Sequence, residues 1–243
     1  MMPTMRHLLV QLLVAALLIS SATAEDEADQ AFKDAQSLAR AGEYEAALER
    51  HQWYHDNALR INKAQYGVRL SFALSAWKKL GEKYPPALAA LTALRDQGTQ
   101  TVLAGNAQPE VFHDVISINH TLAEEDQSVK LFKTLDKTQP DFARRCFHFM
   151  EDTLISAGEV DLFTRYSGDS AAFLQRKIKA HQQLMAIIQK GPGPPQSRLH
   201  FEDKLVTLTL TLSEHAAAKG DPNLAAHLKQ MTAEIISDPR LTQ

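Results

Sequence analysis

Apolar residues recur along most of this chain with the 3.6-residue period of an α-helix. Runs rich in Val, Ile and Thr are scarce, and Gly, Pro and polar residues interrupt the pattern at intervals typical of helices, roughly 12–20 residues. The pattern therefore predicts an all-α fold of about nine to eleven helices. We expect them over residues 28–41, 44–61, 66–81, 86–97, 109–122, 126–137, 140–157, 159–166, 169–190, 197–219 and 222–237.

One segment departs from this pattern. Residues 205–212 read LVTLTLTL, and this near-alternation is typical of a strand. Apolar residues at Phe201, Leu205, Leu208, Leu212 and Ala216 nevertheless keep helical spacing across it. A single strand would also have no partner in this chain, so we expect a helix here.

Two segments mark the predicted organisation of the chain. In residues 1–24, Arg6 precedes an apolar run from Leu8 to Ile19, and small residues end at Ala24, which predicts a signal peptide cleaved after Ala24. The second segment is GPGPP at residues 191–195, which cannot continue a helix. We therefore expect a helical region over 25–190, a Gly/Pro linker over 191–196 and a C-terminal hairpin over 197–243.

Several predicted turns are similar to one another. The stretch AGEYEAAL at residues 41–48 closely resembles the junction between the two helices of a tetratricopeptide (TPR) repeat. LGEKY at 80–84 resembles it too, as do AGEV at 157–160 and KGDP at 219–222 more weakly. The resemblance implies a right-handed, α-solenoid-like stack of antiparallel hairpins, whose first helices line a groove that binds a peptide or protein.

Histidines 51 and 55 lie one helical turn apart on the apolar side of the helix expected over 44–61. One interpretation is that they pack against neighbouring helices and find buried hydrogen-bond partners. The alternative is a metal or catalytic site, because residues at i and i+4 can share one ion. That alternative needs a ligand from another helix, since residues 52–54 lack the Glu of an H-E-x-x-H motif.

A second group of polar and aromatic residues lies off the predicted core faces. If the first helices line a groove, these side chains are candidates for contacting a partner, since aromatic and Arg side chains are enriched at interfaces. The alternative for the flank of helix 109–122 is a partly solvated face. The candidates are Phe32, Gln36, Arg40, Trp53, Phe72, Phe112, His113, Asn119 and His120.

Net charge and amino-acid composition argue against several classes of function. The formal net charge of −3 argues against nucleic acid as the main partner. Cys146 is the single cysteine, so no disulfide can form within the chain, and its Phe-rich surroundings favour a buried, inert thiol. No catalytic, phosphate-binding or cofactor-binding motif is present.

We therefore expect a periplasmic or secreted, non-enzymatic scaffold without a cofactor, which binds a protein or peptide and does not insert stably into a membrane. Two alternatives remain: a metal-binding or enzymatic protein that uses His51 and His55, and a chain that assembles with itself.

Overall fold

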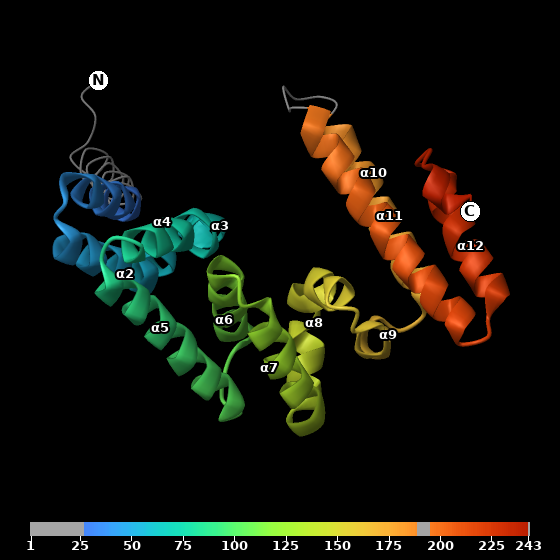
Figure 1. The fold of residues 1–243 in the computed structure, drawn as a ribbon, viewed down its shortest axis with the longest axis horizontal. Coiled ribbons are helices and arrows are strands. Elements are labelled where there is room, and N and C mark those ends of the chain that lie inside the picture. Colours follow the sequence, from blue (N-terminus) through green and yellow to red (C-terminus); the bar gives the residue numbers. More distant parts are fainter. Residues whose placement is uncertain (1–26, 189–194, 243) are drawn as a thin grey trace, which may run out of the picture. The chain divides into compact units, whose positions relative to one another are not determined.

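The computed structural model describes residues 27–188 and 195–242 (Figure 1). These residues form α-helices and short 3-10 helices and contain no strand, so the all-α prediction is confirmed. No helix in the described ranges combines the length and the apolar composition needed to cross a membrane. The predicted signal peptide and most of the predicted linker lie outside the described residues.

The chain divides into two compact units between Leu131 and Phe132. The first unit begins with a helix over residues 27–41. It continues with α2 (Tyr44–Ile61), the 3-10 helix η1 (Lys63–Gln65), α3 (Tyr66–Leu70), α4 (Phe72–Gly81), α5 (Pro85–Leu103), α6 (Pro109–Leu122) and the start of α7 (Glu125–Thr138).

The second unit contains the end of α7 and the rest of the chain. Its helices are α8 (Pro140–Ser156), α9 (Val160–Ser167), α10 (Ser170–Ile188), α11 (Pro195–Ala218), α12 (Pro222–Ala233) and the 3-10 helix η2 (Pro239–Leu241). Helices α11 and α12 form the predicted C-terminal hairpin, and both pack on α10 (Figure 1). The hairpin is therefore part of the same compact unit as α10.

Glycine residues end helices at predicted junctions. Gly42 and Gly220 each have a φ of 85°, the left-handed region that favours glycine. Each follows a helix and lets the chain turn into the next one, as is common at helix C-termini.

Three predicted helices differ clearly from the structure. The helix expected over 222–237 ends at Ala233, as α12. The helix expected over 66–81 is divided at Ser71, which has φ −128° and ψ −83°, into α3 and α4. The helix expected to end at residue 97 continues to Leu103 as α5. Gly98 is typical of an interruption in the sequence, but it lies inside α5, where a Cβ atom would be only 2.7 Å from Cγ2 of Val115. Glycine is used here for close packing of α5 on α6, not for a turn.

The segment with strand-like alternation lies within α11 and is helical, as predicted. Threonine hydroxyls in this segment form hydrogen bonds within the helix. The hydroxyl of Thr209, for example, donates to the carbonyl of Leu205 at 2.9 Å. The Thr209 hydroxyl also lies 2.7 Å from that of Thr232 in α12, inside the hairpin. The alternating Leu and Thr residues therefore lie on a helix in which Thr209 is buried and Thr207 is exposed.

Each unit has an apolar core. In the first, Trp77, Leu74, Leu91 and Ile118 are buried together, and the Trp77 indole donates to the carbonyl of Ala87 at 2.9 Å. In the second, Phe163 is fully buried, and its ring centroid lies 5.4 Å from that of Phe147 and 5.2 Å from that of Phe173. Cys146 is fully buried, in agreement with the prediction.

Candidate functional site

The four aromatic residues predicted to line a groove occupy different environments. Phe112 is fully buried, so its prediction as a partner-binding residue is wrong. Phe32 and Trp53 are half-buried against the N-terminal core, where the Phe32 ring stacks on Tyr54 at 5.3 Å. Phe72 is 71% exposed at the start of α4. These side chains therefore do not form the single aromatic surface that the sequence suggested.

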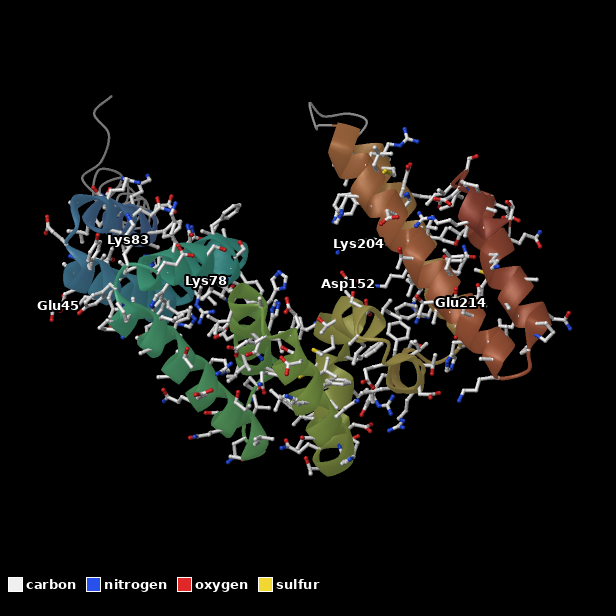
Figure 2. The ribbon with its side chains drawn as sticks, viewed as in Figure 1. Glu45, Lys78, Lys83, Asp152, Lys204 and Glu214 are labelled. Carbon is white, nitrogen blue, oxygen red and sulfur yellow. The ribbon has the colours of Figure 1, made fainter. Side chains whose placement is uncertain are left out.

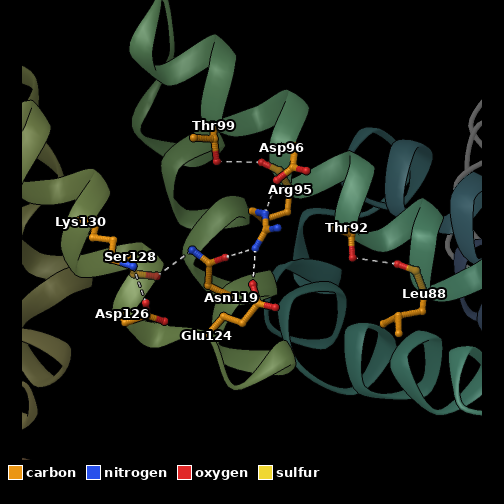
Figure 3. Close-up of polar contacts among 10 residues, drawn as sticks. All are labelled: Leu88, Thr92, Arg95, Asp96, Thr99, Asn119, Glu124, Asp126, Ser128 and Lys130. Carbon is orange, nitrogen blue, oxygen red and sulfur yellow. Dashed lines mark hydrogen bonds and ion pairs between the residues drawn. The ribbon is translucent and has the colours of Figure 1, made fainter.

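Asn119 is also a buried residue and not a surface contact. Its side chain accepts a hydrogen bond from Arg95 of α5 at 3.0 Å and donates one to Ser128 of α7 at 3.0 Å (Figure 3). The Arg95 guanidinium is neutralised by Glu124 at 2.6 Å and Asp96 at 2.5 Å. The network thus joins three helices, and the positive charge of Arg95 is compensated within it.

The remaining predicted residues are distributed over the surface. His113 is half-buried, and its Nδ1 lies 2.6 Å from the hydroxyl of Tyr66. Burial, followed by nearby carboxylates, raises the pKa of Tyr66, so this hydroxyl stays protonated near neutral pH. His120 is exposed and lies 2.8 Å from Glu125. Gln36 is half-buried and Arg40 is exposed on the first helix.

His51 and His55 both lie in the interior of the first unit. The His51 ring is 1% exposed, stacks on Trp77 at 5.9 Å and meets the edge of Phe32 at 6.5 Å. Neither of its ring nitrogens has a hydrogen-bond partner among the described residues, so the expectation of buried partners is wrong for His51. Burial lowers the pKa of His51 to about 4, which keeps the ring neutral near pH 7.

His55 is held by a buried arginine that the sequence pattern does not identify. The Arg69 guanidinium donates to the His55 carbonyl at 2.7 Å and forms a bidentate ion pair with Asp114 at 2.6 and 2.8 Å. Burial, then the charge of Arg69, lowers the pKa of His55 to about 4. Within the part of the chain that the structure describes, Nε2 of His55 has no hydrogen-bond partner.

These histidines are not part of a metal-ligand set in the described structure. No group of three or more His, Cys, Asp or Glu side chains in the described ranges is placed to hold an ion. Asp114, the carboxylate that shares Arg69 with His55, already binds this arginine through both oxygens.

A groove of about 790 Å³ opens between α2, α5 and α6, with Trp77 of α4 also lining it. We call this the α2–α5–α6 groove. Its apolar lining includes Leu94, Val115 and Ile118, and its α5 side carries Ala93, Gln97 and Thr101. Its polar side comprises Gln52, His55, Asp56 and Asp114.

The charges along the polar side are unequal. Asp114 is balanced by Arg69. Asp56 is exposed, and in the described residues the one basic group within ion-pair distance is the neutral His55, at 3.7 Å. This end of the groove therefore carries a net negative charge.

The lining of the groove combines polar side chains with an apolar floor. A peptide ligand uses both, since apolar surface contacts its side chains and polar groups bond to its backbone.

Comparisons with protein-family models, with curated proteins and with solved structures find no match to this chain. The function is therefore argued from the groove itself.

Proposed function

We propose that this protein is an exported, non-enzymatic helical scaffold whose α2–α5–α6 groove binds a peptide segment of a partner protein. The observation that carries the proposal is the groove itself, about 790 Å³, with an apolar floor and one acidic polar side. That volume is in the range of established ligand sites, roughly 300–1,000 Å³.

The lining residues suggest the kind of peptide. Leu94 and Val111, which are half-buried, and the exposed Ala93 offer apolar surface for one or two aliphatic or aromatic side chains of the partner. Gln52 and Gln97 supply amide donors and acceptors for its backbone. Asp56 favours a basic residue at the α2 end. The preferred ligand is thus a short segment with apolar anchors and a Lys or Arg.

The proposal includes a TPR-like arrangement of hairpins. Support comes from the glycines at predicted junctions, since Gly42, Gly158 and Gly220 all follow a helix and have positive φ. Support for export comes from residues 1–24, with their apolar run and small residues before Glu25. N-terminal sequencing of the protein isolated from its host should then begin at Glu25, and an intact Met1 would contradict export by cleavage.

The binding site is tested with a matched pair of substitutions on α5. Peptides are first selected from a random displayed library on the purified wild-type protein. Ala93 is exposed and lines the groove, whereas Ala89 is exposed one turn earlier and does not. Ala93→Arg should weaken the selected peptides at least about tenfold by occupying the groove, and Ala89→Arg should change affinity less than about twofold.

Equal effects of the two substitutions would reject the groove as the binding site. Failure to select any peptide that binds saturably would reject the function.

A further inference from the structure

A second cavity, of about 540 Å³, lies within the C-terminal unit between α8, α10 and α11. Its lining is predominantly apolar. Two buried rings line it, Phe163 of α9 and Phe173 of α10, together with Ile155, Leu184, Phe201 and Leu208. Its volume is also in the range of sites for one small molecule, roughly 300–1,000 Å³.

Each charged side chain that lines this cavity already has an ion-pair partner. Lys177 of α10 binds Glu151 of α8, and Lys204 of α11 binds Asp152 of α8 at 2.7 Å. Figure 2 shows Asp152 and Lys204 pointing toward each other. The third acidic residue, Asp203, lies 2.8 Å from Arg240, which also binds Asp238 at 2.8 Å. A charged ligand would have to break one of these pairs or lose its hydration without compensation.

Among the described lining residues, His181 is the one titratable side chain outside these ion pairs, and it is also uncharged near neutral pH. Burial lowers the pKa of His181, which favours its neutral ring. The hydroxyls of Ser156 and Thr207 are the other polar groups of the lining. The cavity therefore offers hydrogen bonds to a ligand but no free charge, which indicates an uncharged molecule.

Apolar surface continues beyond the cavity along two of its walls. In the described part of this unit, the exposed large hydrophobic residues are Ile187, 69% exposed, and Leu199, 65% exposed. Ile187 lies one turn beyond Leu184 on α10, and Leu199 lies one turn before Asp203 on α11. Because the apolar surface extends in one direction, an elongated ligand would cover more of it than a compact one.

We propose that this cavity binds one uncharged, elongated apolar molecule: an aliphatic chain with a single hydrogen-bonding head group. This site is independent of the α2–α5–α6 groove, since the two lie in different units. Burial of the apolar chain of the ligand supplies the affinity. The ion pairs at the cavity, Glu151 with Lys177 and Asp152 with Lys204, make the binding of anions and cations less favourable.

The test uses the purified full-length protein and the neutral fluorescent probe N-phenyl-1-naphthylamine. The probe should bind saturably at one site, with fluorescence rising on transfer from water. Dodecanol should displace it, and dodecanoate, which has the same chain length and a charged head, should be at least about tenfold weaker. Lack of saturable binding, or equal displacement by the two competitors, would overturn the proposal.

Substitutions locate the site. Ala180 is exposed on α10 and lines the cavity, whereas Ala172 is exposed on the same helix and does not. Ala180→Phe should weaken the probe at least about tenfold, and Ala172→Phe less than about twofold. Ser156→Phe, which fills the cavity from α8, should repeat the effect of Ala180→Phe.

Control variants distinguish binding in the cavity from binding elsewhere on the protein. Each variant is accepted only if its helical circular dichroism matches the wild type. Ala93→Arg, in the groove of the first unit, should leave probe binding unchanged. If Ala172→Phe or Ala93→Arg weakens the probe as much as Ala180→Phe does, the cavity is not the binding site.

Discussion

His51 makes the stability of the first unit depend on pH. Its ring packs against Trp77 and Phe32 and has no hydrogen-bond partner in the described ranges, so protonation would place an unpaired charge in the core. In the unfolded chain the imidazole takes up a proton near pH 6.5, whereas in the folded protein it does so only near pH 4. The folded state therefore loses stability as the pH falls from 6.5 to 4.

The size of this effect follows from the two pKa values. A pKa lowered from 6.5 to about 4 is worth about 3 kcal/mol over the whole window. Between pH 7.5 and pH 4.5 the loss is about 2.5 kcal/mol. The free energy of unfolding of a typical domain is roughly 5–15 kcal/mol. A loss of about 2.5 kcal/mol is therefore about a quarter of the stability of an average domain.

The prediction is tested with His51→Phe, which keeps an aromatic ring and removes the titrating group. Urea unfolding of wild type and variant is followed by tryptophan fluorescence at pH 7.5 and 4.5. The chain has two tryptophans, and both lie in the first unit, so the signal reports on it. The free energy lost on acidification should be smaller in the variant by about 2.5 kcal/mol.

Comparing the change in unfolding free energy between the two pH values separates the titration of His51 from other effects of the substitution. A change in packing alters the stability at both pH values alike and cancels, and His55 is present in both proteins. The matched control is His120→Phe, because His120 is exposed. Should the wild type and His51→Phe lose the same free energy on acidification, within about 0.5 kcal/mol, the reasoning is refuted.

Two further predictions concern packing in the same unit. Arg69→Met leaves Asp114 without its bidentate partner and should lower the free energy of unfolding by about 3 kcal/mol, measured by urea titration; a loss below about 1 kcal/mol would show that the ion pair is not structural. Gly98→Ala should cost about 1–3 kcal/mol, since the new Cβ would lie 2.7 Å from Val115. The matched control is Gly67→Ala, because no atom lies within 4 Å of the new Cβ there. In thermal unfolding this substitution should be neutral or stabilising by about 0.5 kcal/mol. Equal losses of stability at both glycines would contradict the prediction.

The periodic pattern predicts most of the helices well. The ranges 44–61 and 109–122 coincide with α2 and α6, because strong amphipathic periods there are flanked by Gly42 and Pro109. The failure at Gly98 has a tertiary cause. The sequence pattern predicts the end of a helix before this glycine, but the close approach of α6 requires it inside α5, and that contact is not encoded locally.

The candidate site is less predictable than the fold. A single apolar stripe along a helix predicts that one face of it is covered by other helices. Helix α6 instead contacts α3, α4 and α5, and its residue Asn119 also bonds to α7. Phe112 therefore lies in the core, although it is off the predicted stripe. The pairing of Arg69 with Asp114 joins residues 45 positions apart, and periodicity carries no information about such contacts.

Photo-crosslinking of a selected peptide tests the proposed groove most directly. A benzoylphenylalanine residue is introduced at Gln97, which lines the groove, or at Gln100, which is exposed on the same helix outside it. Irradiation with the peptide, followed by mass spectrometry of the adduct, reports which position the ligand contacts. We predict adducts from position 97 and not from position 100. Adducts in equal yield from both positions, or from position 100 alone, would contradict binding in the α2–α5–α6 groove.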